Sequence, residues 1–512
     1  MPSAQLIQSE HAGRRRAGRP AVAIVGGGLA GLAAACALSE SGFQVTVFER
    51  RPYLGGRASS YVHPGTGEVV DNCQHVLFEL CTNLIGFYKR IGIEDRIHWF
   101  DRMTFIEPGG RQSVLQTSFL PAPLHVTPSL VSFKFLTMRD KSLLVYALSA
   151  LLKRKQADPG VPFQVWLERH RQTPNAIERF WKPILISALS EDLDRIAVPY
   201  AAQVVRESMK SRSARIMGIP RVPLSELYIA ARDYITGHGG SVRLRNSVQA
   251  FLPGEDHVEI RVGGSTERFD FAVLAIPFDS LEKLLPESAE GGDLREKLGH
   301  FSTAPITGVH LWFDRPITEL PHAVLLRRTI QWMFHKSLLL APARSSAGLP
   351  ELVASSAPSF RRAGARSLAH DRRQAGDGQT SDGGSYVELV ISASKSLIER
   401  SRQEIIDLAL RELREFFPGA RDASLVKATV VKELNAIFSP TPGIDRYRPG
   451  QRTAWPSVFL AGDWTATGWP ATMEGAVRSG YLAAEELTRS AGGPENYVLP
   501  DLESGGLMRI LG

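Results

Sequence analysis

Short apolar runs followed by turn-forming residues mark the start of the chain. Residues 21–25 are short, β-branched in part and followed directly by glycines, which is typical of a buried parallel strand. The small and apolar residues at 29–39 favour a tightly packed helix, and residues 45–48 favour a second short strand. This strand–helix–strand order predicts a mostly parallel sheet with right-handed crossovers.

The pattern changes further along the chain. From about residue 100 to residue 240 it favours longer helices with few strands, which predicts a separate helical module. Strand-like runs return at residues 241–244, 258–262, 271–276, 309–313 and 386–391, and an amphipathic helix is expected at 401–417. Residues 343–384 are rich in Ser, Ala, Gly and Arg without periodicity, so we expect a disordered insertion there.

Composition narrows the class of protein. The chain has 512 residues, of which 43% are hydrophobic and 22% charged, as in soluble globular proteins of two or three domains. The net charge of +7 permits attraction to an anionic membrane surface but does not call for a nucleic-acid ligand. The longest nearly unbroken apolar stretch, at 143–152, is far shorter than the roughly 20 residues that span a bilayer.

Cysteine usage and the first residues bear on location. Cys36, Cys73 and Cys81 form neither a disulfide framework nor a zinc-site spacing, so a reducing compartment is expected. Residues 1–20 contain several arginines but no apolar core, so they do not form a secretory signal. We expect a disordered arm there rather than a targeting segment, and a cytoplasmic protein.

The glycines after the first strand form a dinucleotide fingerprint. Gly26, Gly28 and Gly31 fit G-x-G-x-x-G: a tight turn, close approach to a pyrophosphate, and close packing of helix on sheet. The helix N-terminus presents free N–H groups to phosphates. Glu49 ends the second strand 21 residues after Gly28, where an acid accepts hydrogen bonds from an unphosphorylated ribose. FAD and NAD both satisfy this pattern.

The residues after the acid resemble those of one large family. A second glycine turn and an arginine, Gly55-Gly56-Arg57, follow at once. This segment resembles the family of flavin amine oxidases, carotenoid desaturases and protoporphyrinogen oxidases. The resemblance implies FAD, with Gly56 in the turn and Arg57 at the FAD phosphates. It also implies that the backbone of Val248 meets the adenine.

A segment near the C-terminus resembles the same family. Residues 458–464 form a strand that ends in glycine and an acid, and a helix begins at Met473. The resemblance implies that Asp463 binds the ribityl and phosphate region and that the helix beginning at Met473 points at the pyrimidine edge of the flavin. A positive helix end stabilises the negative charge of reduced flavin. We expect the glycines of this helix to let the ring system lie close.

Because these signals lie at both ends of the chain, we predict an α/β fold with a discontinuous Rossmann-like FAD-binding domain and an inserted mixed sheet and helical substrate module. The predicted parts are a disordered arm at 1–20, a first FAD-binding part at 21–100, a helical substrate or membrane-facing module at 101–240, a second FAD-binding part at 241–300, a substrate-domain sheet at 301–450 with the insertion at about 343–384, the C-terminal closure at 451–490, and a tail at 491–512.

Several motifs resemble a narrower group, the bacterial squalene-associated FAD enzymes, or hydroxysqualene dehydroxylases. They lie at residues 71–76, 180–183, 223–228, 311–316 and 461–475, and the last is the most specific. The resemblance covers nearly the whole chain except the arm and the insertion. It implies reductive removal of an allylic hydroxyl from a linear C30 isoprenoid: an acid helps to ionise the C–O bond, flavin delivers hydride, and water is excluded.

The apolar residues of the helical module suit such a substrate. We predict a tunnel formed by Phe119, Leu120, Leu130, Val131, Phe133, Phe135 and Leu136. The apolar residues from 119 to 152, followed by Lys153-Arg154-Lys155, also suit shallow docking on the inner face of the cell membrane. Ordinary core helices with a solvated basic end fit the same pattern.

The catalytic acid is the least determined feature. His75 lies in a segment that the family places near the flavin, so it is a candidate acid or water-positioning group. A histidine paired structurally at a strand end is the more common case. The same alternative applies to His310, and Glu474 is interpreted as a helix-end acid.

Other functions remain open at this stage. One is a phytoene-type carotenoid desaturase or an amine oxidase, in which oxidised FAD accepts hydride. Another is a non-catalytic, FAD-stabilised scaffold for isoprenoid enzymes. The sequence leaves the oligomeric state open, and no metal site is predicted.

Overall fold

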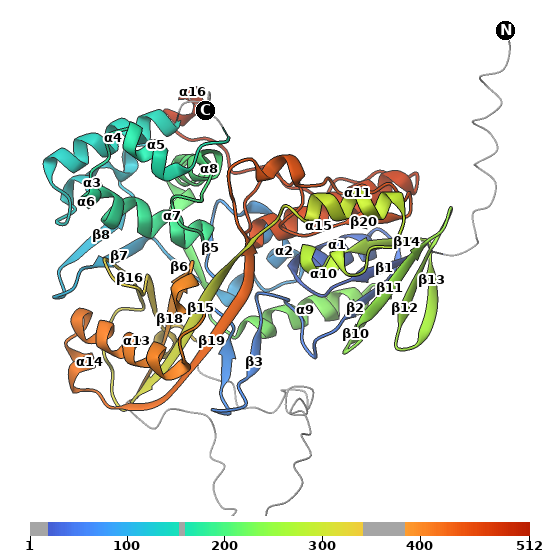
Figure 1. Ribbon diagram of the computed structural model, residues 1–512, viewed down its shortest axis with the longest axis horizontal. Coiled ribbons are helices and arrows are strands. Elements are labelled where there is room, and N and C mark those ends of the chain that lie inside the picture. Colours follow the sequence, from blue (N-terminus) through green and yellow to red (C-terminus); the bar gives the residue numbers. More distant parts are fainter. Residues whose placement is uncertain (1–18, 153–158, 341–383, 512) are drawn as a thin grey trace, which may run out of the picture.

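The computed structural model describes residues 19–152, 159–340 and 384–511. The predicted arm at 1–20 and the predicted insertion at 343–384 therefore fall almost wholly outside the described residues, and so does the basic run at 153–155. In Figure 1 the right half of the molecule holds a parallel sheet with its helices, and the left half holds a second sheet below a group of helices.

The parallel sheet is assembled from three distant parts of the chain. Its order is β10-β2-β1-β14-β20, and every neighbouring pair is parallel. The strands are β1 (Ala21–Val25), β2 (Gln44–Glu49), β10 (Ser241–Leu244), β14 (Phe271–Leu274) and β20 (Val458–Leu460). The prediction of a discontinuous domain is therefore confirmed, with strands from the start, the middle and the end of the chain in one sheet.

Two helices bring the ends of the chain together. α1 (Leu29–Glu40) is buried along almost its whole length, as its small and apolar residues require, and α15 (Met473–Ser490) packs directly on it. A Cβ at Gly480 would overlap the carbonyl oxygen of Ala30. The prediction that the helix glycines make room for the flavin is therefore wrong at Gly480, because this glycine makes room for α1.

The second sheet is mixed, as predicted. Its order is β19-β15-β18-β17-β16-β7-β8, with β16 and β7 parallel and the other pairs antiparallel. The strands are β7 (Arg102–Ile106), β8 (Gln112–Gln116), β15 (Thr303–Phe313), β16 (His322–Leu325), β17 (Trp332–His335), β18 (Ser385–Ser392) and β19 (Leu425–Phe438). α13 (Arg402–Phe416) packs on one face and begins with a capping box made by Ser401 and Glu404.

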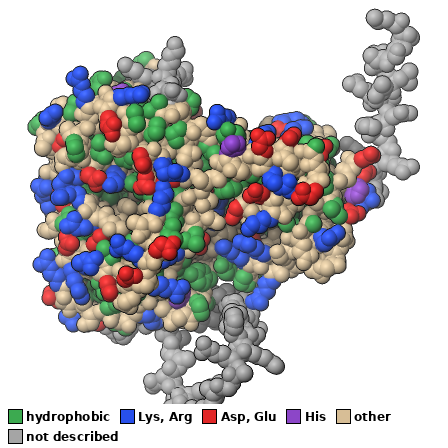
Figure 2. All heavy atoms as spheres, in the orientation of Figure 1, with side chains coloured by type: hydrophobic (Ala, Val, Ile, Leu, Met, Phe, Trp, Pro, Cys, Tyr) green, Lys and Arg blue, Asp and Glu red, His purple; other side chains and the backbone are tan. Residues whose placement is uncertain are grey.

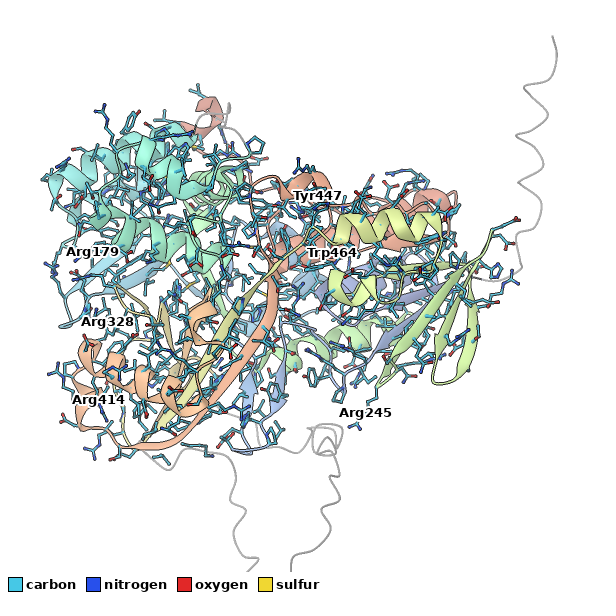
Figure 3. All side chains as sticks on the ribbon, in the orientation of Figure 1. Arg179, Arg245, Arg328, Arg414, Tyr447 and Trp464 are labelled. Carbon is cyan, nitrogen blue, oxygen red and sulfur yellow. The ribbon has the colours of Figure 1, made fainter. Side chains whose placement is uncertain are left out.

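The boundary predicted for the helical module at residue 101 is wrong, because β7 and β8 belong to the mixed sheet. Buried and exposed residues alternate along 112–115, which is the period of a strand. The module proper contains α3 (Thr127–Ser132), α4 (Met138–Leu152), α5 (Phe163–Arg169), α6 (Pro174–Ala176), α7 (Lys182–Leu189) and α8 (Val198–Met209). Arg179, labelled in Figure 3, forms an ion pair of 3.1 Å with Glu107, which directly follows β7, and so joins the module to the sheet.

Smaller elements complete the described chain. The strands are β3 (Ser60–Val62), β4 (Val69–Asp71), β5 (Leu77–Phe78), β6 (Ile97–Phe100), β9 (Met217–Pro220), β11 (Val248–Pro253), β12 (Val258–Val262) and β13 (Ser265–Phe269). The helices are α2 (Thr82–Arg90), α9 (Leu224–Gly237), α10 (Phe278–Glu282), α11 (Ala289–Leu298), α12 (Lys336–Leu339), α14 (Gly419–Asp422) and α16 (Met508–Leu511). Among the described residues, no helix is long and apolar enough to cross a membrane.

The C-terminal tail runs back over the body of the protein. The Leu499 N–H donates to Asn83 Oδ1 at 2.8 Å, and the Leu507 N–H donates to the Ala122 carbonyl at 2.7 Å. The tail therefore connects the parallel-sheet half of the molecule with the helical module.

Candidate active site

Glycine stands at the three fingerprint positions for different physical reasons. A Cβ at Gly26, whose φ is +110°, would lie 2.5 Å from the Ala275 carbonyl oxygen, and a Cβ at Gly31 would overlap the Gly26 carbonyl oxygen. Gly28 has an ordinary φ of −78°, and the nearest atom to its Cβ would be Gly56 Cα at 3.8 Å. The fold therefore requires glycine at 26 and 31, whereas the open space above Gly28 suits a ligand that approaches the backbone.

The acid at the end of β2 is held in place by backbone donors. Glu49 Oε2 accepts from the Gly27 N–H at 2.8 Å, and Oε1 accepts from the Arg51 N–H at 2.7 Å. The Glu49 carbonyl accepts from the Asn246 N–H at 2.9 Å, two residues before Val248 at the start of β11. The predicted ribose and adenine residues thus lie at one end of the parallel sheet, beside the glycine turn, and these residues fit the adenosine half of FAD.

The predicted phosphate and ribityl residues meet across the fold. Arg57 Nη2 lies 2.5 Å from Asp463 Oδ1, and Arg57 Nη1 donates to the Ala436 carbonyl at 2.9 Å. Asn72 braces this turn, because its Nδ2 donates to the Arg57 carbonyl at 2.5 Å. Asp463 is buried, whereas 32% of the Arg57 side chain is exposed. Part of the guanidinium thus remains available to an anion.

The end of β20 leads into the second predicted flavin contact. Trp464, labelled in Figure 3, is buried near the centre of the molecule, and its indole N–H donates to the Ile276 carbonyl at 3.0 Å. Thr472 caps α15 by accepting from the Gly475 N–H at 3.0 Å. The first N–H groups of α15, beginning at Met473, have no partner within the helix and can face an anionic ring edge.

Glu474 has a structural role. Its Oε1 accepts from the backbone and side-chain N–H groups of Asn83 at 3.2 and 2.9 Å, and its Oε2 accepts from the Leu84 N–H at 2.8 Å. These donors lie in the first turn of α2, whose own N-cap residue provides no side-chain hydrogen bond. Glu474 therefore caps α2 from a distant helix, and its carboxylate is fully occupied.

We expect Glu474→Ala to lower the free energy of unfolding by about 1–3 kcal/mol, because α2 loses its cap and buried N–H groups lose their acceptor. Urea denaturation followed by circular dichroism measures this change. Glu178→Ala, which removes an exposed i,i+4 partner of Lys182, is the control and is expected to change stability by less than about 1 kcal/mol. Equal effects of the two substitutions would contradict the capping role.

An apolar cavity of about 280 Å³ ends at the same helix. It is lined by residues from separate segments along the chain, including Gln74, Val76, Phe78, Met103, Phe105, Leu115, Ile184, Val204, Trp332, Phe334, Val390, Trp469, Pro470 and Met473. The predicted tunnel residues are not among the lining residues. Phe133 and Phe135 pack behind Phe105 with ring centres 5.6 and 6.2 Å away, and Phe119 is 84% exposed. That prediction was wrong because the cavity wall comes from strands as much as from the helical module.

The charges at the cavity are not those of a cation site. Arg215 lines the cavity, and no carboxylate of the described residues forms an ion pair with it; burial lowers its pKa to about 10. Glu207 also lines the cavity but is paired with Lys210 at 3.1 Å, and Glu474 is occupied as described. The cavity therefore presents an uncompensated positive charge and no free carboxylate.

Neither of the two candidate histidines, His75 and His310, lines the cavity. Gln74 and Val76 line the cavity, whereas His75 between them does not, and its Nδ1 lies 2.7 Å from the Cys73 carbonyl oxygen. Burial lowers the pKa of His75, so the ring is neutral at pH 7. His310 is fully buried with its Nδ1 2.8 Å from the Tyr386 hydroxyl. A direct role of His75 toward the cavity is not supported by this geometry, and its role stays a prediction.

Comparisons with known proteins agree with this site. The family of flavin-containing amine oxidoreductases matches residues 29–488. The chain is 27% identical to the 15-cis-phytoene desaturase of Synechococcus elongatus over 91% of this chain and 95% of that protein. It is 24% identical to the zeta-carotene desaturase of Synechocystis sp. over 93% and 99%. The solved structure of an oxidoreductase from Methanosarcina mazei has the same fold, with a TM-score of 0.64, 17% identity, and coverage of 90% and 98%.

Proposed function

The chain belongs to the family of flavin-containing amine oxidoreductases, and within it we propose that this FAD-dependent oxidoreductase removes the allylic hydroxyl of hydroxysqualene to give squalene. The product would serve squalene and hopanoid formation. One observation carries the proposal furthest: an apolar cavity without a free carboxylate leads to the start of α15, within the segment 461–475 that resembles the hydroxysqualene dehydroxylases.

The proposed reaction divides its work between the cofactor and the protein. Bound FAD, once reduced, supplies the hydride. The C–O bond breaks as the hydroxyl takes up a proton and leaves as water, and hydride then adds to the allylic carbon. Apolar side chains such as Phe334 and Val390 would exclude bulk water from that carbon, so that it does not recapture a hydroxyl. The N–H groups at the start of α15 would stabilise negative charge on the reduced ring.

A carotenoid desaturase is the second candidate. The relatives named as desaturases at 24% and 27% identity favour it, and an apolar cavity also suits a phytoene-like chain. The two candidates differ in the direction of hydride transfer: a desaturase passes hydride to oxidised FAD, whereas a dehydroxylase takes it from reduced FAD.

An amine substrate is less compatible with the cavity. A protonated amine needs a carboxylate or an aromatic cage to replace its hydration. Aromatic side chains such as Trp332 and Phe334 do line the cavity, but Arg215 would repel a second cation there, since no carboxylate of the described residues forms an ion pair with it. Glu207 and Glu474 are committed to Lys210 and to α2. We expect no oxidation of primary or polyamines.

The experiment that separates these candidates uses the purified FAD-loaded protein. Chemically reduced protein is mixed with hydroxysqualene, oxidised protein with phytoene or with putrescine, and the products are identified by mass spectrometry. We expect squalene from the first mixture alone. A desaturated carotenoid from the second mixture would overturn the proposal, and no turnover of any substrate would favour the scaffold function.

We also propose that the protein is cytoplasmic and docks on the inner face of the cell membrane through exposed apolar residues of the helical module and the C-terminal tail, together called the apolar patch. The patch consists of Phe119, Leu124, Val131, Met138, Leu507 and Ile510, all exposed, with Phe119 at 84% and Ile510 at 85%. The contact between Leu507 and Ala122 brings α16 beside the first of these segments. Figure 2 shows hydrophobic side chains among charged ones over this module.

The charges around the patch suit an anionic surface. Lys134, Arg139 and Arg509 are exposed on the same segments as the patch residues. Apolar side chains that enter the lipid interface and basic side chains that meet anionic headgroups are the usual features of a shallow docking surface. Such docking would let a water-insoluble isoprenoid reach the cavity from the membrane.

We expect the double variant Phe119→Glu with Ile510→Glu to bind vesicles containing phosphatidylglycerol at least about tenfold more weakly than the unchanged protein, because apolar burial is lost and like charge is added. Co-sedimentation with vesicles measures this. Val426→Glu, at a 67% exposed position of β19, is the control and should leave binding unchanged. Equal binding by the double variant would exclude the patch as the docking surface.

A further inference from the structure

The face of the mixed sheet that forms part of the cavity wall continues into a buried group of ionisable side chains. Phe334 of β17 and Val390 of β18 line the cavity. Glu388 lies two residues before Val390, so it points to the same face, and it pairs in register with Phe334 on one side and His310 on the other. Along this face of β18, an apolar side chain at position 390 is thus followed by a buried carboxyl at position 388.

Lys336 connects this carboxyl to the cavity wall. Its Nζ lies 3.4 Å from Glu388 Oε2 and donates to Gln74 Oε1 at 2.7 Å and to Asp71 Oδ2 at 2.7 Å. Gln74 itself lines the cavity, and its Nε2 is fixed by donation to the His75 carbonyl at 3.0 Å. The side chains of Lys336, Asp71 and Glu388 are at most 4% exposed. A continuous polar contact therefore runs from Glu388 to the cavity.

The two carboxyl groups of this cluster differ in their partners. Asp71 Oδ1 accepts from the Ser60 hydroxyl at 2.6 Å and from the Leu224 N–H at 3.2 Å, in addition to the Lys336 bond of Oδ2. Glu388 has weaker partners: the Lys336 ammonium lies 3.4 Å from its Oε2, and the Gln74 backbone is its other polar neighbour. Asp71 is thus held ionised as the permanent counter-ion of Lys336. Glu388 is the carboxyl that can take up or release a proton without losing strong hydrogen bonds.

Protonation states agree with this division. Burial raises the pKa of Glu388 to about 7, although Lys336 opposes the change, whereas Lys336 and hydrogen bonds hold the pKa of Asp71 below its usual range despite burial. Among the neighbouring groups, burial lowers the pKa values of His63 and His75 from their usual value. Burial lowers the pKa of His310 to about 3, and burial raises those of Tyr386 and Cys73 well above their usual values.

We propose that Glu388 is the proton reservoir for the departing hydroxyl and that Lys336 carries the proton to the cavity wall beside Gln74; this rests on the proposed dehydroxylation. With substrate bound, the Lys336 ammonium exchanges its bond to Gln74 Oε1 for one to the hydroxyl oxygen. It gives that oxygen a proton as the C–O bond breaks, and water leaves. The Glu388 carboxyl returns a proton to Lys336, and solvent later reprotonates Glu388. The electron pair for the allylic carbon comes as hydride from reduced flavin, so charge and atoms balance.

The test is the pH profile of squalene formation by reduced holoprotein. Glu388 must be protonated, so we expect the unchanged protein to be most active below about pH 7 and to lose activity as the pH rises through that value. Glu388→Gln should form squalene about a hundredfold more slowly, without this inflection, while hydroxysqualene binding stays unchanged. Glu388→Asp should restore part of the rate and an inflection at a changed pH.

A matched control lies on the opposite face of the sheet. Glu412 is also buried, but its oxygens accept from the Thr329 and Ile330 N–H groups at 3.1 and 3.0 Å, so Glu412→Gln should keep the unchanged pH profile. Flavin content and thermal unfolding confirm that each variant is folded. If folded Glu388→Gln forms squalene with the original rate and profile, the reservoir proposal is overturned. If the unchanged protein forms no squalene at any pH, the proposed function itself has failed.

Discussion

Gly28→Val is expected to fold normally and to bind no FAD. A Cβ at this position would be 3.8 Å from its nearest protein atom, and the backbone φ of −78° accepts any residue. The added Cβ would therefore make only an ordinary contact with Gly56, and the branched side chain would occupy the space through which a pyrophosphate approaches the turn. Purified Gly28→Val should lack the visible absorbance of flavin, with at least about a hundredfold weaker rebinding of added FAD, or roughly 3 kcal/mol.

Two further variants serve as comparisons for Gly28→Val, one for folding and one for flavin content. Gly31→Val should fail to fold or unfold at a much lower temperature, because its side chain would overlap the Gly26 carbonyl oxygen. Gly292→Val, at a position in α11 with nothing within 4 Å, should keep a full complement of flavin. A yellow, FAD-saturated Gly28→Val protein would show that the ligand does not cross this turn.

Lys336→Met is expected to lower the free energy of unfolding by about 3–5 kcal/mol at pH 8, because it leaves Asp71 and Glu388 buried without their shared cation. The loss should be smaller at pH 5. Both carboxyl groups then have raised pKa values in the folded variant, so each binds a proton as the pH falls, and protonation removes the buried charge. Chemical denaturation at the two pH values measures the difference.

An exposed lysine provides the comparison for this variant. Lys182→Met removes an i,i+4 pair with Glu178 in which both side chains are about half exposed, so it should change stability by less than about 1 kcal/mol at either pH. A Lys336→Met protein as stable as the unchanged one at pH 8 would contradict the buried ion cluster.

The nucleotide half of the site could be predicted because its signals are local. The strand, Gly26, Gly28, Gly31 and the following helix lie within about 20 residues, and the structure forms these elements as expected. The role of Asp463 was predicted from the resemblance to the family, on a segment with a strand, an acid and a helix in that order. The ion pair between Arg57 and Asp463 joins positions 406 residues apart and is visible only in the fold.

The substrate half could not be predicted in the same way. Lys336 and Asp71 are 265 residues apart, and a lysine after a strand has no sequence feature that marks it as buried. The cavity wall takes every second residue from strands such as β7, β17 and β18, where alternation decides which side chain faces inward. Apolar clustering alone therefore selected Phe133 and Phe135, which are core residues. The alternation at 112–115 is present only in the burial of the folded chain, because Ser113 faces inward and Val114 outward, so the sequence does not show it.

The direction of hydride transfer distinguishes the proposed function from its main alternative. Under anaerobic conditions, fully reduced holoprotein is mixed with one equivalent of hydroxysqualene while flavin absorbance and product are followed together. We expect the flavin to become oxidised as an equal amount of squalene forms. Flavin that stays reduced with hydroxysqualene, together with oxidised flavin that becomes reduced on addition of phytoene, would contradict the proposed dehydroxylation.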